Sequence, residues 1–250
     1  MPKSLKQSER IEKALQLLGL EGIRFSYSNL AQKFIKDKSN PYDFLECLLE
    51  KQIVWKEENR LQRWLQQAHF PWQKTLKDFD FSFQPSIDKR QVYELASCRF
   101  IDKGENVIFL GPPGVGKTHL AISLGLEAIY KGYEVRFLTL DQLIELANRA
   151  SDGEKLRRLF STLVRQRLLI LDEMDLYEAD SAVSTFLFKL LHQRYEEGSV
   201  IFTSNKTFTD WGKLFGSQAR AGAILDRITH HSTIITIEGE SYRIKDKLKG

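Results

Sequence analysis

An eight-residue glycine-rich segment limits the folds open to this chain more than any other feature. Residues 111–118 read Gly-Pro-Pro-Gly-Val-Gly-Lys-Thr, which matches the phosphate-binding loop G-x-x-x-x-G-K-[ST]. The segment follows an apolar run, 106–110, and precedes a helical pattern over 117–131. Glycines let backbone N–H groups turn inward around phosphates, and the helix that follows presents its positive end to the anion. A tight turn without a ligand is the alternative, and the strand–loop–helix setting argues against it.

The last residues of this loop have defined roles toward a nucleotide. Lys117 is expected to reach the β- and γ-phosphates of ATP, and the Thr118 hydroxyl is expected to bind Mg²⁺. We therefore expect ATP and Mg²⁺ as cofactors, with Thr118 and Asp172 at the metal and Asp172 acting through water. The expected nucleotide contacts are Gly111, Pro112, Pro113, Gly114, Val115, Gly116, Lys117, Thr118, His119, Asp172 and Arg243.

Two carboxylates follow a second apolar strand. Residues 168–171 are Leu-Leu-Ile-Leu, and Asp172 and Glu173 come directly after them. In a parallel sheet the end of this strand lies beside the phosphate loop, where Asp172 can orient Mg²⁺ and Glu173 can polarise the water that attacks the γ-phosphate. The alternative is that the pair only caps the next helix. For Asp175, in the same acidic cluster, a cap or a structural hydrogen bond is the favoured role.

A further polar residue ends another apolar strand. The run 199–204 is followed by Asn205, whose amide could hydrogen-bond the γ-phosphate or the attacking water and so sense whether the nucleotide is cleaved. A plain turn role is the alternative, and the position of Asn205 after a strand of the expected parallel sheet argues against it.

Three arginines near the carboxyl end, Arg220, Arg227 and Arg243, are candidates for stabilising charge on the γ-phosphate. Arg227 follows an apolar helical run. We favour it as an arginine finger, a residue whose guanidinium contacts the γ-phosphate of the nucleotide bound to a neighbouring subunit. A surface ion pair with Asp226 is its alternative role. Arg243 is a candidate for a second nucleotide contact or for a structural role. The expected catalytic residues are Lys117, Glu173, Asn205 and Arg227.

From residue 86 onward, strand patterns alternate with helical patterns, which is typical of a parallel sheet covered on both faces. The sequence therefore predicts an α/β core with a five-stranded parallel sheet. The expected strands are 106–110, 133–140, 167–172, 199–204 and 233–238. The expected helices lie near 90–103, 117–131, 141–150, 153–166, 180–197 and 218–230.

The sequence of residues 1–72 predicts a separate, all-helical module. Helical spacing covers residues 6–20, 26–38 and 42–67, and the domains are expected to be 1–72 and 73–250, with 73–90 as an extended connector. Basic side chains lie on the polar faces of these helices, and they are candidates for nucleic-acid binding or simply solvated surface. They are Lys33, Lys36, Lys38, Lys51, Lys56, Arg60 and Arg63.

Charge and composition are compatible with a polyanionic partner. The net charge is +4, and all of this excess lies in the first 90 residues, which hold 16 Lys and Arg against 12 Asp and Glu. No run of 18 apolar residues is present, and the amino-terminal residues lack an apolar signal segment. Cys47 and Cys98 have no disulfide or metal-ligand spacing, so we expect reduced thiols and a cytoplasmic protein.

These motifs together resemble those of a known family. The segments GPPGVGKTHLA, LLILDE, VIFTSN, ILDRITHHS and GESYRIK are similar to the IstB family of AAA+ ATPases, which are helper proteins encoded beside the transposase of insertion sequences. The DnaC helicase loaders and the DnaA initiators are related to this family. The resemblance covers roughly residues 70–247 and implies an AAA+ P-loop core. Members often have a glycine and an aromatic residue after the glutamate at 173, where this chain has Met174-Asp175-Leu176-Tyr177.

The resemblance implies a function as well as a fold. It implies an ATP-dependent homo-oligomer that binds duplex DNA without strong sequence preference, selects target sites and stimulates a cognate transposase. It also implies that Arg227 occupies the finger position, and that the segment 141–166 lines a nucleic-acid channel. Basic residues available there are Arg149, Lys155, Arg157, Arg158 and Arg165.

Two other functions are compatible with the phosphate loop. A helicase-loading adaptor similar to DnaC would share the core motifs and would need an exposed apolar docking face on its amino-terminal module. A small-molecule kinase would leave Glu173, Asn205 and Arg227 without a purpose.

Overall fold

The chain forms two compact units, Met1–Arg63 and Trp64–Gly250. The computed structural model describes residues 3–150, 152–175, 181–215 and 218–243. The division falls inside the third helix, on the amino side of the domain boundary expected after residue 72. The end of that helix belongs to the second unit, within which Arg136 Nη1 donates a hydrogen bond to the Gln67 carbonyl at 3.0 Å.

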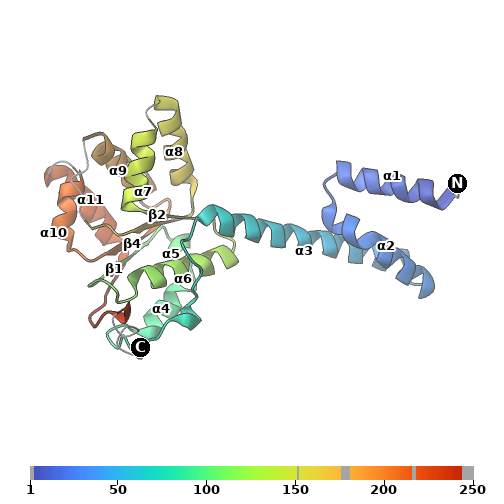
Figure 1. Cartoon of the computed structure of the whole chain (residues 1–250), viewed down its shortest axis with the longest axis horizontal. Coiled ribbons are helices and arrows are strands. Elements are labelled where there is room, and N and C mark those ends of the chain that lie inside the picture. The colour runs from blue at the N-terminus through green and yellow to red at the C-terminus, as the bar shows by residue number, and fades with distance from the viewer. Residues whose placement is uncertain (1–2, 151, 176–180, 216–217, 244–250) are drawn as a thin grey trace. The chain divides into compact units, whose positions relative to one another are not determined.

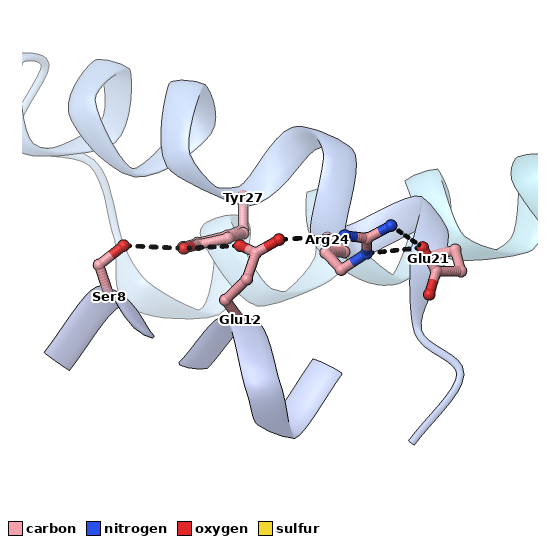
Figure 2. Close-up of polar contacts among 5 residues, drawn as sticks. All are labelled: Ser8, Glu12, Glu21, Arg24 and Tyr27. Carbon is pink, nitrogen blue, oxygen red and sulfur yellow. Dashed lines mark hydrogen bonds and ion pairs between the residues drawn. The ribbon is translucent and has the colours of Figure 1, made fainter. Parts of the chain in front are cut away.

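The described residues of the first unit form the three predicted helices, the third of which continues into the second unit. A continuous series of polar contacts joins the first two of them, and Figure 2 shows its members. Arg24 binds both Glu21, with its Nε at 2.6 Å from Oε2, and Glu12, with Nη1 at 3.2 Å from Oε1. The Tyr27 hydroxyl donates to Glu12 Oε2 at 3.3 Å and lies 3.1 Å from Ser8 Oγ. The helices are α1 (Lys3–Leu17), α2 (Glu21–Lys36) and α3 (Pro41–Ala68).

Helix α2 begins five residues earlier than the prediction of 26–38. The serine at position 26 has the residue type of a helix amino-terminal cap, but its hydroxyl donates to the Gly22 carbonyl at 2.7 Å within the helix. Ile23 is buried, and its N–H donates to Gln52 Oε1 of α3 at 3.2 Å. Contact with α3 therefore holds the first turn of α2 in helical form.

The second unit contains a five-stranded sheet in the order β2-β3-β4-β1-β5, with every pairing parallel. This confirms the predicted fold class. Leu110 pairs with Ser204 on one side and with Thr236 on the other, so the carboxyl ends of the central strands lie at one edge. The strands are β1 (Asn106–Leu110), β2 (Val135–Thr139), β3 (Leu168–Asp172), β4 (Ser199–Ser204) and β5 (Ser232–Thr236).

Helices cover both faces of this sheet (Figure 1). Alternate strand residues face opposite layers. Ile108 and Phe202 belong to a buried apolar cluster with the helices of one layer, whereas Ile170 approaches Gly125 of α6 on the other face. The first layer contains α7 (Leu140–Arg149), α8 (Gly153–Arg165), α9 (Ser181–Arg194) and α11 (Gln218–His230), and the second contains α6 (Lys117–Tyr130).

The segment between α3 and β1 differs from the prediction in two places. The connector is not extended throughout, because a 3-10 turn forms where the Asp78 carboxylate accepts from the Thr75 N–H and hydroxyl. The expected helix 90–103 is two short helices, because Cys98 adopts a left-handed backbone conformation with φ 65° between them. The additional elements of the unit are η1 (Leu76–Asp78), α4 (Lys89–Leu95), α5 (Arg99–Asp102), α10 (Phe208–Trp211) and η2 (Gly212–Phe215).

The remaining strand and helix predictions agree with the structure to within a few residues at each end. Residues 176, 177 and 180 and those beyond 243 lie outside the described residues. Within the described part of the chain, no helix combines the length and the apolar character needed to cross a membrane.

Candidate functional site

The loop between β1 and α6 has the backbone shape that the glycine pattern predicts. Gly111 and Gly114 have φ angles of 150° and 83°, in the region that favours glycine. A Cβ at Gly111 would lie 2.3 Å from the Ile237 carbonyl oxygen, and one at Gly114 would lie 2.0 Å from Ser241 Oγ. Side chains at these positions would collide with Ile237 and Ser241, so only glycine lets the loop adopt this shape beside that segment. A loop of this shape, with its backbone N–H groups turned inward, can hold a phosphate group.

Lys117 points its amine into this loop. Its Nζ donates to the carbonyl oxygens of Gly111 at 2.7 Å and Pro112 at 2.8 Å. Burial lowers the pKa of Lys117, while the carboxylates of Asp175 and Asp172 act in the opposite direction. A charged acceptor stabilises a buried ammonium more strongly than neutral carbonyl oxygens do. A triphosphate is therefore a suitable partner for the Lys117 amine.

Thr118, at the start of α6, and Asp172, at the end of β3, are in contact beside the phosphate loop. Thr118 Oγ1 donates to Asp172 Oδ1 at 2.9 Å, and Thr203 Oγ1 also donates to Asp172. Burial raises the pKa of Asp172, and these two hydroxyl contacts partly oppose that shift. A hydroxyl and a carboxylate are hard oxygen ligands, which fit Mg²⁺.

No group of three or more His, Cys, Asp or Glu in the described chain is arranged to hold a metal by itself. Magnesium commonly binds proteins through one or two carboxylates and completes its coordination with phosphates and water. The donor set of Thr118 and Asp172 matches that mode of binding, in which the nucleotide would share the metal.

Glu173 lies at the end of β3 with its side chain exposed to the same cleft. Its backbone is left-handed, with φ 57°, and its N–H donates to Thr203 Oγ1 at 3.0 Å. Partial burial raises the pKa of Glu173, and the nearby carboxylates of Asp172 and Asp175 add to the shift. Strained backbone at a polar position is common at functional sites, where the side chain must point in one direction.

Asn205 lies at the end of β4, beside Glu173. Its backbone N–H donates to Asp175 Oδ1 at 2.6 Å, and the neighbouring Ser204 Oγ donates to the same oxygen at 2.7 Å. The structural hydrogen bond predicted for Asp175 is therefore confirmed. The Asn205 side chain itself lines the cleft.

One cleft of about 300 Å³ brings most of the predicted residues together. Gly111, Pro112 and Asp172 are not on its surface: the first two hold Lys117, and Asp172 holds Thr118. Predicted residues on its wall are Pro113, Gly114, Val115, Gly116, Lys117, Thr118, His119, Glu173, Asn205 and Arg243.

Several residues of the cleft were not predicted from the sequence. Trp72 and Phe79 of the connector contact the ring of His119, with centroids 5.8 Å and 5.2 Å away, and the His119 Nε2 lies 2.9 Å from the Thr75 carbonyl. Tyr242 N donates to the Gly114 carbonyl at 2.9 Å. The aromatic residues before the first strand were a signal, but only the path of the connector shows that they reach the phosphate loop.

Arg227 lies away from this cleft. It is in the last turn of α11, next to Ile228, whose carbonyl accepts from the Asn106 side chain at the start of β1. Its guanidinium lies over the Tyr195 ring, 5.8 Å from the centroid. The amino ends of the strands form the edge of the sheet opposite to the phosphate loop, so Arg227 and its own cleft lie at opposite edges.

The basic residues predicted to bind nucleic acid are exposed and do not line the cleft. On α7 and α8, Arg149 pairs with Glu145 and Arg158 pairs with Glu154, each one helical turn away. Lys155 and Arg157 belong to the same polar faces. Lys33, Lys36, Lys38, Arg60 and Arg63 belong to the first unit.

Comparisons with known proteins agree with this geometry. A family model described as IstB-like ATP binding protein matches residues 13–250. The putative ATP-binding protein of insertion sequence IS21 from Pseudomonas aeruginosa is 44% identical over 239 residues, covering 96% of this chain and 90% of that protein. The corresponding protein of insertion sequence IS5376 from Geobacillus stearothermophilus is 41% identical, covering 96% and 95%.

Solved structures share the fold of the second unit. The crystal structure of DnaI has a TM-score of 0.54 at 22% identity, covering 68% of this chain and 90% of that chain. The AMPPCP-bound structure of DnaA from Aquifex aeolicus has a TM-score of 0.52 at 24% identity, covering 70% and 54%. At these identities the likeness shows the fold alone, which is the predicted α/β core with a parallel sheet and a phosphate loop.

Proposed function

The chain belongs to the family of IstB-like ATP-binding proteins, and from this premise we propose that it is a Mg²⁺-dependent ATPase that assembles on duplex DNA and acts with a transposase. One observation carries the proposal: Lys117, Glu173, Asn205 and Arg243 converge on a single cleft. A protein that only bound ATP would not need Glu173 and Asn205 beside the phosphate loop.

The residues of the cleft have complementary roles in hydrolysis. Lys117 and Arg243 bear positive charge where negative charge develops on the γ-phosphate. Glu173, whose pKa is raised by partial burial, accepts a proton from the attacking water, and Asn205 orients that water. Bound Mg²⁺ would neutralise charge on the phosphates.

The position of Arg227 supports a homo-oligomer. A guanidinium at the opposite edge of the sheet cannot serve its own cleft, but it is free to serve the cleft of a neighbouring copy packed head to tail. ATP between two subunits would then be contacted by the phosphate loop of one and by Arg227 of the next.

Exposed basic residues support DNA binding through the phosphate backbone. Those on α7 and α8 lie on the polar faces of two amphipathic helices, whose apolar faces are packed into the core. Contacts of this kind carry little sequence information. The relatives are named as ATP-binding proteins of insertion sequences, so the cognate transposase is the proposed partner.

A helicase-loading adaptor is the second candidate, and the first unit supplies the observation that favours it. Several large apolar side chains of α2 and α3 are exposed, including Phe25, Ile35, Tyr42, Leu49 and Ile53. Such side chains suit a protein partner better than DNA. Pull-down against the transposase and against a replicative helicase discriminates between the two functions.

The main test of the ATPase proposal is Glu173→Gln. This change keeps the size of the side chain and leaves the phosphate loop intact, so ATP binding should stay at the wild-type level. We expect phosphate release to fall by about 100-fold or more, since a general base contributes about 10²–10⁴-fold. Lys117→Ala is the control that loses nucleotide binding as well. Wild-type turnover by E173Q would remove Glu173 from the assigned role.

DNA binding is tested by fluorescence anisotropy with two duplexes of unrelated sequence, with and without a slowly hydrolysed ATP analogue. We expect tighter binding with the analogue, similar affinity for both duplexes, and a log–log salt slope of about −0.9 for each phosphate neutralised. Arg157→Ala combined with Arg158→Ala should reduce the slope by about one or two units. An affinity that does not change with salt would contradict binding through the phosphates.

A further inference from the structure

Glu173 and Asn205, which are proposed to act on the same γ-phosphate, both lie on loops. Glu173 follows β3 and Asn205 follows β4, and both side chains are exposed on the cleft wall. A loop residue keeps a fixed position only where contacts restrain it. The spacing of Glu173 and Asn205 therefore depends on the contacts between the two loops.

Hydrogen bonds join these loops at successive residues. The N–H of Glu173 donates to Thr203 Oγ1 at 3.0 Å, and the N–H of Met174 donates to the Thr203 carbonyl at 2.9 Å. These bonds restrain the Glu173 backbone against the carboxyl end of β4. They end at Thr203, two residues before Asn205.

The Asp175 carboxylate extends the series to Asn205. Its Oδ1 accepts from the Asn205 N–H at 2.6 Å and from Ser204 Oγ at 2.7 Å. The Ser204 hydroxyl in turn accepts from Trp211 Nε1 at 3.1 Å and from the Lys206 N–H at 2.9 Å. Since both acceptor positions of the hydroxyl are used, its proton is left to donate to Asp175. Hydrogen bonds to a carboxylate are about twice as strong as neutral ones.

We propose that Asp175 is a positioning residue, which holds the Asn205 backbone in place relative to Glu173 so that both side chains reach one γ-phosphate. The inference rests on the proposed ATPase function. A misplacement of about 1 Å near a reacting group costs on the order of 100-fold in rate. Loss of the carboxylate should therefore slow hydrolysis. The described structure shows no hydrogen bond between the Asp175 side chain and the phosphate loop, so the affinity for ATP should not change.

The test compares Asp175→Ala with Asp175→Asn in the full chain. Asn keeps an oxygen that can accept both hydrogen bonds, and Ala does not. We expect D175A to lower kcat by about 10- to 100-fold without raising the KM for ATP more than about twofold, and D175N to restore kcat to within about threefold. Asp210→Ala is the matched control, because Asp210 accepts from Thr207 Oγ1 within its own turn, and its kcat should not change.

Amide hydrogen exchange over residues 199–207 gives a readout that does not need turnover. We expect faster exchange in D175A than in the wild type or D175N. Wild-type kcat in D175A overturns the proposal, and so does a D175N chain as slow as D175A. A wild-type chain that binds ATP without hydrolysing it overturns the proposed function instead. In that case, unchanged exchange in D175A shows that Asp175 does not hold the loop, and faster exchange shows that it does.

Discussion

His119 is the residue at which the connector and the phosphate loop are joined. It follows Lys117 and Thr118, and its Nε2 lies 2.9 Å from the Thr75 carbonyl, with Trp72 and Phe79 around the ring. A carbonyl only accepts, so Nε2 carries the proton. Burial lowers the pKa of His119, with a smaller effect of Thr75 in the other direction. The folded state therefore favours the neutral imidazole.

This preference predicts a dependence of stability on pH. Above about pH 6.5 the imidazole is neutral in both states, and the folded form is fully stabilised. As the pH falls through that value, the unfolded chain binds a proton more readily than the folded chain, so the free energy of unfolding decreases. His119→Gln keeps a donor to Thr75 and does not titrate. Urea unfolding at pH 7.5 and 5.5 gives the free energy of unfolding at each pH. This free energy should decrease less between the two values in H119Q than in the wild type. The control is His192→Gln, at an exposed position, which should show the same decrease as the wild type. Equal losses in H119Q and the wild type would contradict this assignment.

At the scale of single residues, the sequence predicted those parts of the site that depend on short-range order. Lys117, Thr118 and Asp172 follow from one motif and from the end of one apolar strand, because parallel strands bring their carboxyl ends to one edge. Thr203 and Phe79 could not be predicted in the same way. Their contacts with Asp172 and His119 depend on register across the sheet and on the path of the connector.

Among the helices, α8 depends on a contact that its own sequence does not reveal. Arg194, in the last turn of α9, has only 2% of its surface exposed. Its guanidinium donates to the carbonyls of Leu163 at 2.7 Å and Gln166 at 2.8 Å, at the end of α8, and to Ser199 at 2.7 Å, at the start of β4. Burial lowers the pKa of Arg194 to about 10, so the side chain stays protonated at neutral pH. It satisfies carbonyls that a helix end would otherwise leave unpaired.

Replacing this arginine should therefore loosen α8. We expect Arg194→Met to lower the free energy of unfolding by about 3 kcal/mol or more, because several buried carbonyls lose a charged donor. Exchange at the end of α8 should rise, while ATP binding should persist at the far edge of the sheet. Arg165→Ala, at an exposed position of the same helix, should change stability by less than about 0.5 kcal/mol. A fully stable R194M chain would show that the contact has little energetic value.

The predicted boundaries of helices were wrong where tertiary contacts or an unusual backbone conformation outweighed the local sequence pattern. Helical spacing predicted that the second helix begins at residue 26, but packing of Ile23 near Gln52 extends α2 toward its amino end. The helix expected over 90–103 divides at Cys98, whose left-handed backbone nothing in the local apolar pattern indicates. The strands, in contrast, were predicted closely, since each is a short apolar run that ends in polar residues or a turn.

For the whole molecule, the central question is whether one copy can complete its own active site. Glu173 belongs to the edge of the sheet that holds the phosphate loop, and Arg227 belongs to the opposite edge. We therefore expect Arg227→Ala to bind ATP normally and to lose hydrolysis by roughly 10³–10⁵-fold, as arginine fingers typically contribute. This loss alone does not distinguish a finger acting in trans from a residue required for folding.

Mixing two inactive variants makes that distinction. A subunit with E173Q has a defective cleft and an intact Arg227, whereas a subunit with R227A has an intact cleft and no finger. In a head-to-tail assembly formed at equal concentrations, about a quarter of the interfaces join the intact cleft to the intact finger, so phosphate release should recover to about that fraction of wild type. The double variant E173Q/R227A, mixed with R227A, supplies no finger and should restore nothing. If Arg227 acted within its own subunit, neither mixture would regain activity, because every subunit would still lack one of the two residues.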